Sequence, residues 1–386
     1  MHEFDRTACD LALTMAESVR GTTSPNPAVG AVIVRDGHII ATGATQPPGH
    51  AHAERAALIK AGEAARGADL YVTLEPCTFQ GRTPACTDAI IESGIRHVYY
   101  MVNDRDPRMG IGAATTLAAH GIGCSQIQFD DARVATTLAP FFMRLQHKRP
   151  WMTLKYAMSL DGKIATHTGA SQWISNSQSR MQVHQIRAQV DAVVTASGTA
   201  IMDNPQLTVR IPHRYSSHQP TRVLFDSRGR TPITHHLFDT QTAKTMVIST
   251  KQASQKWIDS LNTKGVMVIQ QPHAGQIHLH DAVTQLATHG INHCLIEAGA
   301  VFAGALLDAH LIDEIHAFIA PGIIGNHHAP GPVAGQGISN LTNWQQFRIR
   351  HAAMCDGDVH IHAIHHHALQ LQQLLLEGKE TCSLVS

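Results

Sequence analysis

The sequence lacks the features that mark several large classes of protein. Its 30 Lys and Arg balance 30 Asp and Glu, so the net charge is zero, which argues against nucleic acid as the main partner. No run of about eighteen apolar residues and no secretory leader is present, so we expect a cytoplasmic protein that does not enter the membrane. The 7 cysteines, an odd number without a disulfide-framework spacing, fit a reducing compartment.

Glycine-rich nucleotide-binding motifs are absent as well. No Gly-x-Gly-x-x-Gly follows a first strand and no Walker sequence occurs, which disfavours a Rossmann or P-loop domain. The length of 386 residues and a hydrophobic fraction of 43% are sufficient for two domains with full cores. Strand-like and helix-like segments alternate along the chain, which predicts an α/β protein with parallel or mixed sheets covered by helices.

The periodicity of the apolar residues places the individual elements. Helices are expected at 4–19, 52–60, 85–92, 113–119, 177–189 and 301–309, with a helix and linker at 134–149. Strands are expected at 29–34, 38–43, 70–73, 97–102, 152–157, 191–195, 222–226, 244–249, 265–269 and 293–297. The sequence therefore predicts a first domain over residues 1–148, a second over 149–367 and a tail over 368–386, which is either an appended helix or disordered.

Three residues of the first domain are candidate zinc ligands. His52, Cys77 and Cys86 supply one imidazole and two thiolates, and three such ligands leave the fourth position of a tetrahedral zinc ion to water. Glu54 follows the histidine by two residues and is placed to carry protons rather than to bind the metal. This order of His-x-Glu and Pro-Cys is typical of zinc-dependent nucleobase deaminases. The pattern therefore predicts hydrolytic deamination.

Other interpretations of these residues stay open. His50 is able to replace His52 as the ligand, and the cysteines are compatible with a structural zinc site or a metal-free core. Structural sites usually have four protein ligands, and no fourth Cys or His stands nearby at a finger-like spacing. Eight residues separate Cys77 from Cys86 (86 − 77 − 1 = 8), where nucleic-acid editing enzymes have two, so we expect a loop before a helix that Cys86 opens.

Two further sites are ambiguous on the sequence alone. Asn26 lies between two prolines and is either a turn former or an amide that faces the edge of a heterocycle. Glu297 and Gly299 lie between a strand and an apolar helix, where small residues either bring backbone amides to a phosphate or serve packing. The 28 histidines, several of them in 357–367, are interpreted as surface residues rather than a metal store, because no zinc-ligand spacing recurs there.

Nearly the whole chain resembles the bifunctional deaminase-reductases of riboflavin biosynthesis, the RibD family. The resemblance covers residues 1 to about 365 and includes motifs of both halves in the same order. The matching stretches are Pro25-Asn26-Pro27-Ala28-Val29-Gly30, His52-Ala53-Glu54, Thr73-Leu74-Glu75-Pro76-Cys77, Gly81-Arg82-Thr83-Pro84-Ala85-Cys86, residues 155–165, residues 203–210 and Glu297-Ala298-Gly299.

The resemblance implies a cytidine-deaminase-like three-layer domain followed by a dihydrofolate-reductase-like domain. The first would deaminate a diaminopyrimidinone ribosylamine 5′-phosphate, with one Zn²⁺ on His52, Cys77 and Cys86, Glu54 as proton shuttle and Asn26 on the base. The second would use NADPH to reduce the ribosyl group to a ribityl chain. The implied partner is this small phosphorylated pyrimidine, with no nucleic acid and no membrane, and the family leads us to expect a homodimer.

In the reductase half, the resemblance implies two groups of contacts. Residues against NADPH would be Ala157, Trp173, Thr199, Asp203 and Gly299, and residues at the sugar phosphate would be Ser171, Arg187, Leu207, Arg210 and Glu297. Arginine suits the second group because guanidinium groups pair well with phosphate oxygens.

Ordinary roles remain open for some reductase residues. Trp173 also fits a core position, Arg187 a solvated helix face, and Lys155 a strand residue with a packed stem. Lys155 and Asp203 are candidates for positioning or proton transfer. Ala196 and Asn204 depart from the family's commoner Gly and Asp, which bears on details of cofactor binding.

Overall fold

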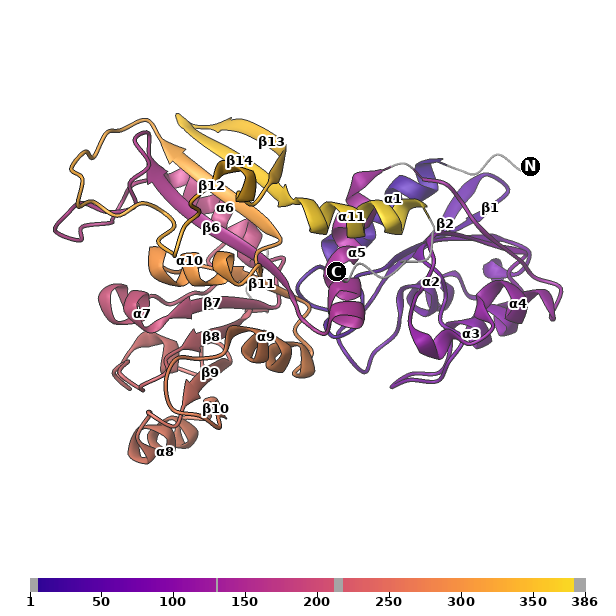
Figure 1. Ribbon diagram of the computed structural model, residues 1–386. Coiled ribbons are helices and arrows are strands. Elements are labelled where there is room, and N and C mark those ends of the chain that lie inside the picture. The colour runs from indigo at the N-terminus through magenta and orange to yellow at the C-terminus, as the bar shows by residue number, and fades with distance from the viewer. Residues whose placement is uncertain (1–5, 130, 212–217, 378–386) are drawn as a thin grey trace. The chain divides into compact units, whose positions relative to one another are not determined.

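The structure is a computed structural model that describes residues 6–129, 131–211 and 218–377. It divides into two compact units. The first holds the described residues up to His147 together with those from Gln370 onward, and the second is Lys148–Leu369. Figure 1 labels most helices and strands of both units, and each unit is described separately below.

The first unit is built on a five-stranded mixed sheet in the order β2-β1-β3-β4-β5, in which β1 is antiparallel to its neighbours and β3, β4 and β5 are parallel. Its strands are β1 (Gly30–Arg35), β2 (His38–Ala44), β3 (Asp69–Leu74), β4 (His97–Val102) and β5 (Gly123–Gln126). Its helices are α1 (Arg6–Ser18), α2 (Ala53–Ala61), α3 (Cys86–Ser93), α4 (Gly112–Ala118) and α5 (Ala132–His147), with 3-10 turns at Gly62–Ala65 and Pro107–Met109.

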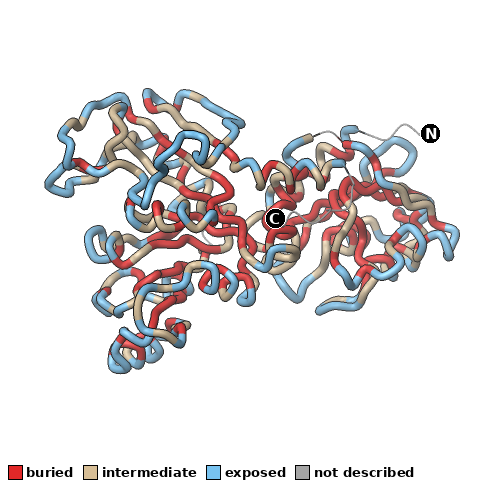
Figure 2. Tube along the Cα trace, in the orientation of Figure 1, coloured by how far each residue is buried: buried red, intermediate tan, exposed pale blue. Residues whose placement is uncertain are grey.

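Two glycines bring helices against opposite faces of this sheet. A Cβ on Gly30 would lie 1.9 Å from the Ala12 carbonyl oxygen of α1, and one on Gly43 would lie 2.2 Å from the Ala53 carbonyl oxygen of α2. Gly30 pairs with Ala44 of β2, so these two residues point to the same face of the sheet. Gly43 is adjacent to Ala44 in β2 and therefore points to the opposite face. The unit therefore has three layers, and β strands buried between helices appear as continuous red segments in Figure 2.

The second unit contains a nine-stranded sheet in the order β10-β9-β8-β7-β11-β6-β12-β14-β13. The strands from β10 to β12 are parallel, and β14 and β13 complete the sheet as an antiparallel hairpin. The strands are β6 (Trp151–Ser159), β7 (Ala192–Ala196), β8 (Thr221–Phe225), β9 (Thr245–Thr250), β10 (Met267–Gln271), β11 (His293–Ile296), β12 (Glu314–Ala320), β13 (Phe347–Cys355) and β14 (Asp358–His365).

The helices of the second unit are α6 (Ser177–Arg187), α7 (Ser197–Asp203), α8 (Gln255–Thr263), α9 (Leu279–Thr288) and α10 (Ala300–Asp308), with 3-10 turns at His236–Phe238 and Leu341–Asn343. Successive residues of a strand pack into different hydrophobic cores, one on each face of the sheet. On β7, Val193 belongs to the core that includes Trp257 of α8, and Val194 to the one that includes Leu286 of α9. Burial on both faces explains why the central strands β7, β8 and β11 are short and mostly apolar.

The α/β class predicted from the sequence is confirmed, and most predicted elements lie within two residues of the observed ones. The prediction missed β5, β12, β13 and β14. The tail begins within α11 (His366–Glu377), the appended helix of the two alternatives, and residues 378–386 lie outside the described residues. In the described part of the chain, no helix is both long and apolar enough to cross a membrane.

Candidate functional site

The three candidate zinc ligands lie together in the first unit. His52 immediately precedes α2, Cys77 follows β3, and Cys86 is the first residue of α3. The Nδ1 atom of His52 lies 3.3 Å from the Cys86 Sγ and 3.7 Å from the Cys77 Sγ. One ligand atom from each residue lies within 4.8 Å of the other two. Loops beyond strand ends therefore bring one nitrogen and two sulfur atoms to one point.

This donor set fits zinc. Zinc–sulfur bonds of about 2.3 Å and zinc–nitrogen bonds of about 2.0 Å place tetrahedral N and S ligands roughly 3.5 Å apart. The two observed N···S separations bracket that value. His50, the alternative ligand, is exposed and is not part of the group. The described residues near the group supply no fourth Cys or His, which leaves one position for a water or substrate atom.

Hydrogen bonds hold the Cys77 sulfur in the form that binds metal. The backbone N–H of Cys86, at the start of α3, donates to the Cys77 Sγ over 3.3 Å. Hydrogen bonds from the Cys86 thiol and from His52 lower the pKa of the Cys77 thiol to about 5. Cys77 is therefore a thiolate at neutral pH, the state required of a zinc ligand.

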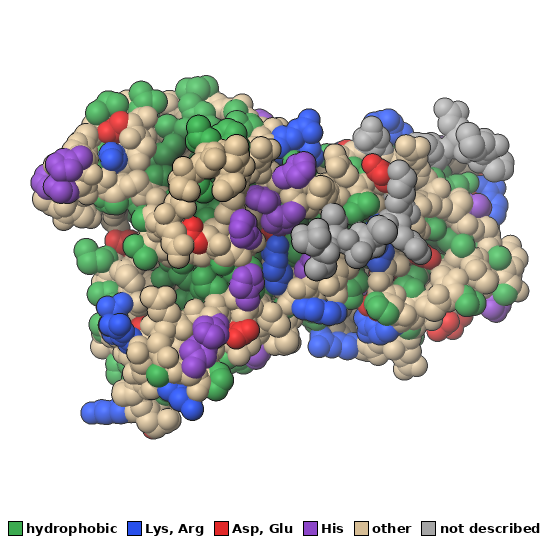
Figure 3. Space-filling model, in the orientation of Figure 1, with side chains coloured by type: hydrophobic (Ala, Val, Ile, Leu, Met, Phe, Trp, Pro, Cys, Tyr) green, Lys and Arg blue, Asp and Glu red, His purple; other side chains and the backbone are tan. Residues whose placement is uncertain are grey.

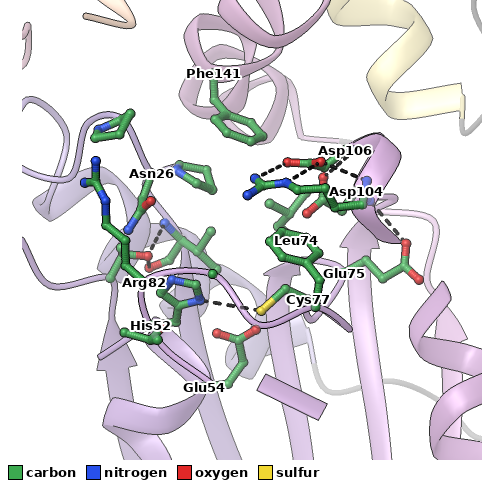
Figure 4. Close-up of a pocket in the computed structure, with 18 of the residues that line it drawn as sticks. Asn26, His52, Glu54, Leu74, Glu75, Cys77, Arg82, Asp104, Asp106 and Phe141 are labelled. Carbon is green, nitrogen blue, oxygen red and sulfur yellow. Dashed lines mark hydrogen bonds and ion pairs between the residues drawn. The ribbon is translucent and has the colours of Figure 1, made fainter. Parts of the chain in front are cut away.

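Glu54 lies beside the ligand group without joining it. It is the second residue of α2 and only 4% exposed. Figure 4 shows its carboxyl group directed toward Cys77. Burial, reinforced by the charge of Cys77, raises the pKa of Glu54 to about 7. A carboxyl group with a pKa near neutrality both accepts and donates protons, which is what a proton shuttle requires.

A cavity of about 270 Å³ opens onto these residues (Figure 4). Its volume suits a small molecule. Asn26 lines it, and Arg144 of α5 donates to the Pro25 carbonyl oxygen over 2.9 Å, which ties this turn to α5. The other lining residues include Pro27, Val29, Thr45, Leu74, Phe79, Arg82, Asp104, Asp106, Arg108 and Phe141.

Two residues of this cavity escaped the sequence analysis. Asp104 follows β4, and burial, with smaller effects from the neighbouring charges of Asp106, Glu75 and Cys77, raises its pKa to about 7. Arg82 lies on the loop between Cys77 and Cys86 and is exposed. The position of Asp104 after β4 could have identified it from the sequence. Cys77 follows β3, and the carboxyl ends of the parallel strands β3 and β4 meet at one edge of the sheet.

In the second unit, four predicted residues form one charged group. Arg187, at the end of α6, makes a two-pronged ion pair with Glu297 after β11, with N···O distances of 2.5 and 2.9 Å. Both side chains are nearly buried, so Arg187 is not on a solvated helix face. Burial lowers the pKa of Lys155 on β6, and the nearby Glu297 limits that shift. Arg210 donates to the Thr208 hydroxyl over 3.3 Å and Arg187 to the Thr208 carbonyl oxygen over 2.9 Å, so Thr208 links Arg210 to this group.

The junctions before α7 and α10 form a second group. The N–H of Gly299, which precedes α10, donates to the Thr199 hydroxyl over 2.9 Å. A Cβ on Gly198 would meet nothing within 4 Å. Both helices begin at carboxyl ends of the parallel strands β7 and β11, where cofactors bind in α/β proteins. The open backbone and the hydroxyl at these junctions fit a dinucleotide phosphate.

The remaining predicted residues lie apart from these contacts. Ser171, Trp173 and Asp203 make no hydrogen bond with either group within the described ranges. Trp173 is 70% exposed with the Arg180 guanidinium 4.7 Å above its ring, so it is not a core residue. Ala157 is half-buried on β6, and Leu207 is buried with a φ of 52°.

The departures at positions 196 and 204 have local explanations. Asn204 ends α7 in the left-handed conformation, with a φ of 40°, and asparagine tolerates this conformation better than most residues. Its side-chain oxygen also accepts a hydrogen bond from the His236 N–H over 2.9 Å. Ala196 precedes α7 in an extended conformation that does not require glycine.

Two family models match successive parts of the chain. Residues 2–102 match the cytidine and deoxycytidylate deaminase zinc-binding region, and residues 150–361 match the RibD C-terminal domain. The chain is 36% identical over 364 residues to the riboflavin biosynthesis protein RibD of Escherichia coli. The aligned region covers 92% of this chain and 97% of the relative. It is 39% identical to the protein of the same name from Aquifex aeolicus, over 84% of this chain and 89% of the relative.

Solved structures give the same result. RibD of Acinetobacter baumannii superposes with a TM-score of 0.82 at 32% identity, over 93% of this chain and 98% of the other. A diaminohydroxyphosphoribosylaminopyrimidine deaminase/5-amino-6-(5-phosphoribosylamino)uracil reductase of Thermotoga maritima superposes with a TM-score of 0.81 at 31% identity, over 93% and 98%. The similarity therefore extends over both units.

Proposed function

Because the chain belongs to the RibD family of riboflavin biosynthesis proteins, we propose that its two units act in succession on one phosphorylated pyrimidine. The chain is a bifunctional enzyme with a deaminase domain and a reductase domain. The proposed substrate is 2,5-diamino-6-ribosylamino-4(3H)-pyrimidinone 5′-phosphate, and the proposed final product is 5-amino-6-ribitylaminouracil 5′-phosphate. The convergence of His52, Cys77 and Cys86 beside a buried Glu54 is the observation that supports this proposal most strongly.

For the deamination, His52, Cys77 and Cys86 would hold one Zn²⁺. When bound, the ion supplies a Lewis acid that activates water at neutral pH. Glu54 accepts a proton from the attacking water and delivers it to the departing amine, which leaves as ammonia. Its burial keeps bulk water from competing for that proton.

Residues around the cavity would orient the pyrimidine. The Asn26 amide offers a donor and an acceptor to the edge of the base. Asp104, with its pKa raised to about 7 mainly by burial, is partly protonated at neutral pH and offers a hydrogen bond of either kind. Arg82 lies at the open side of the cavity, where its guanidinium group would bind the substrate phosphate.

For the reduction, the second unit would bind NADPH along the junctions at Thr199 and Gly299. The cofactor supplies the hydride. The ion pair of Arg187 with Glu297 fixes the guanidinium group, which would then meet the sugar phosphate in a set geometry, and Lys155 would position the substrate or transfer a proton. Ser171, Leu207 and Arg210 would complete the sugar-phosphate contacts, and Ala157, Trp173 and Asp203 those with NADPH. We further propose that the protein is cytoplasmic and forms a homodimer. Size-exclusion chromatography with light scattering tests the dimer.

A single assay tests both activities. The purified protein receives the diaminopyrimidinone ribosylamine phosphate and NADPH, and ammonia release and NADPH oxidation are followed in the same tube. We expect both signals, with ammonia appearing first. Ammonia alone would contradict the proposed reductase, and the absence of both would contradict the proposed substrate.

Replacement of Glu54 tests its role as proton shuttle. Glu54→Gln keeps the size of the side chain and removes the acid–base function, so we expect deamination to fall by about 10²–10⁴-fold. Zinc content stays unchanged because Glu54 is not a ligand. NADPH oxidation with the deaminated intermediate, a reaction of the other unit, serves as the control. Deamination at the original rate would refute this role.

A further inference from the structure

A second group of metal-binding side chains lies in the second unit, on β12 and β14. These strands are antiparallel neighbours (Figure 1), and the strand pairing places His316 directly opposite His362. Glu314 is two residues from His316 on the same strand, so its side chain lies on the same face of the sheet. One possible ligand atom from each of these three residues lies within 4.8 Å of those of the other two. None of these residues belongs to the groups described above.

The two imidazoles converge on one carboxylate oxygen. The Nε2 atoms of His362 and His316 lie 2.5 and 3.5 Å from the Glu314 Oε1. The two rings stack with centroids 4.5 Å apart and planes 6° apart. The side chains of Glu314, His316 and His362 are 9%, 13% and 20% exposed. The group is therefore sheltered from water on most sides.

Neighbouring residues hold this group in position. The other oxygen of Glu314, Oε2, accepts hydrogen bonds from the Trp151 Nε1 over 2.8 Å and from the Thr153 hydroxyl over 2.7 Å. This leaves Oε1 to the histidines. The Nδ1 of His316 lies 2.8 Å from the Nε2 of His360. With its proton on Nδ1, the neutral His316 ring keeps an unprotonated Nε2, which faces Glu314 and has a lone pair for a metal ion. Such outer hydrogen bonds orient histidine and carboxylate ligands at metal sites.

We propose that Glu314, His316 and His362 bind a second divalent transition-metal ion, of the class of Zn²⁺. Two imidazoles and a carboxylate are a common ligand set for zinc, and they leave a fourth position for water. Tetrahedral N and O ligands lie roughly 3.4 Å apart, close to the separation of His316 from Glu314. The shorter contact of His362 opens when the ion replaces the proton between the two groups.

The site links the antiparallel hairpin to the parallel part of the sheet. Glu314 and His316 lie on β12, which pairs with β6, and His362 lies on β14, which pairs with β13. An ion here bonds across the junction of the two sheet types. The histidine-rich segment 357–367 is thus not a loose surface tract, because His362 is largely buried and His360 half-buried on β14. Figure 3 shows further histidines of the second unit at its surface, in separate groups.

Metal content of the full-length protein tests the proposal. The protein is incubated with excess Zn²⁺, freed of loose ions with a weak chelator, and its zinc per chain is measured by mass spectrometry. We expect two ions per chain in the wild type and one in His362→Gln or His316→Gln. His351→Gln is the matched control, because this exposed histidine lies opposite His362 on β13 but outside the ligand group, and it keeps two. One ion in the wild type, or two in His362→Gln, overturns the proposal.

A second comparison separates this site from the deaminase site. Cys77→Ser removes the ion of the deaminase site, so we expect it to retain one ion, which the double variant Cys77→Ser/His362→Gln loses. If Cys77→Ser retains no zinc, the second site does not exist, whether or not the enzyme deaminates its proposed substrate. Should the histidine variants fail to fold, ¹¹³Cd NMR of the wild type decides. Two resonances are expected, one from a site with two thiolates and one from a site with only N and O ligands, and a single thiolate-type resonance contradicts the proposal.

Discussion

Three arginines line the cavity of the deaminase unit, and their surroundings differ. The Arg108 guanidinium pairs with Asp106 over 2.5 Å and lies 4.1 Å from the centre of the Phe79 ring. Arg144 donates to the Pro25 carbonyl oxygen. Arg82 makes no hydrogen bond or ion pair with any residue of the described ranges. Its charge is therefore available to a ligand, whereas the other two serve at least partly to hold the cavity wall.

We expect Arg82→Gln to weaken substrate binding without affecting the metal. Loss of a charge-assisted hydrogen bond to phosphate costs about 1.5–3 kcal/mol, which corresponds to a rise in KM of roughly 10- to 150-fold. Zinc content and the rate at saturating substrate remain close to those of the wild type. The same substrate without its phosphate is the control, because it cannot use Arg82. An equal loss with both substrates would show that Arg82 does not bind the phosphate.

At the residue scale, sequence identifies functional groups best when a local spacing defines them. His52 and Glu54 are two residues apart, and Cys77 follows a proline in a recognisable pattern, so these residues were found from the sequence. Asp104 became a candidate only when the structure placed it in the same cavity. His316 and His362 are far apart in sequence, and only strand pairing makes them neighbours. No spacing rule captures contacts of this kind.

At the scale of elements, the position of α2 determines the geometry of the deaminase site. This helix follows His52 directly and carries Glu54 in its first turn. It lies against β2 because Gly43 has no side chain: an added Cβ would lie 2.2 Å from the Ala53 carbonyl oxygen and 2.5 Å from the Ala57 nitrogen. Both atoms belong to the helix backbone, so a methyl group has to move the whole helix.

We therefore expect Gly43→Ala to lower zinc affinity as well as stability. The overpacking costs about 1–3 kcal/mol, and displacement of His52 weakens zinc binding by about 10-fold or more. Gly30→Ala is the matched control. Its Cβ would meet the Ala12 carbonyl oxygen at 1.9 Å and so displaces α1, which carries no ligand. Thermal unfolding and a zinc competition titration distinguish the two effects, and equal zinc affinities in both variants would contradict the expectation.

Most elements could be predicted because their apolar residues recur with a clear period. The strands β7, β8, β9 and β11 are mostly apolar runs between helices, a pattern that results from burial on both faces. The missed hairpin has a different environment. Most of β13 is exposed at the edge of the sheet, and β14 alternates histidines with apolar residues. Its histidines occupy positions where the prediction expected polar surface, so burial by β12 was not foreseen.

At the scale of the whole molecule, the second unit contains a buried ion pair that makes its stability depend on pH. Asp313 is fully buried and pairs with Arg149 through two contacts of 2.7 Å, with His367 at 2.9 Å. Burial alone would raise the pKa of Asp313, but Arg149 and His367 lower it to about 2. The unfolded chain binds this proton near pH 3.9, so the ion pair stabilises the native state fully above that value.

We expect this stabilisation, about 2–3 kcal/mol, to disappear as the pH falls from about 4 to about 2. The four tryptophans, Trp151, Trp173, Trp257 and Trp344, all lie in the second unit, so their fluorescence reports its unfolding. Urea titrations give the free energy of unfolding at each pH. In Asp313→Asn, stability is lower by about 3–5 kcal/mol at neutral pH, because Arg149 loses its partner, and its decline with acid is shallower. If the free energy of unfolding falls equally with pH in the wild type and in Asp313→Asn, Asp313 is not the source of the pH dependence.

The zinc ligands of the deaminase site all belong to the first unit, and each unit has its own core. Zinc binding should therefore stabilise one unit selectively, since a ligand stabilises only the structure that binds it. We expect Cys77→Ser to lose the zinc ion of the deaminase site and its deaminase activity, and to lower the calorimetric transition of the first unit. The transition reported by tryptophan fluorescence stays in place, and the deaminated intermediate still supports NADPH oxidation. Cys124→Ser, on β5 and outside the ligand group, is the control and retains all five properties. If the tryptophan transition falls together with the calorimetric one, the two units unfold as a single cooperative body, and loss of zinc would then impair both activities.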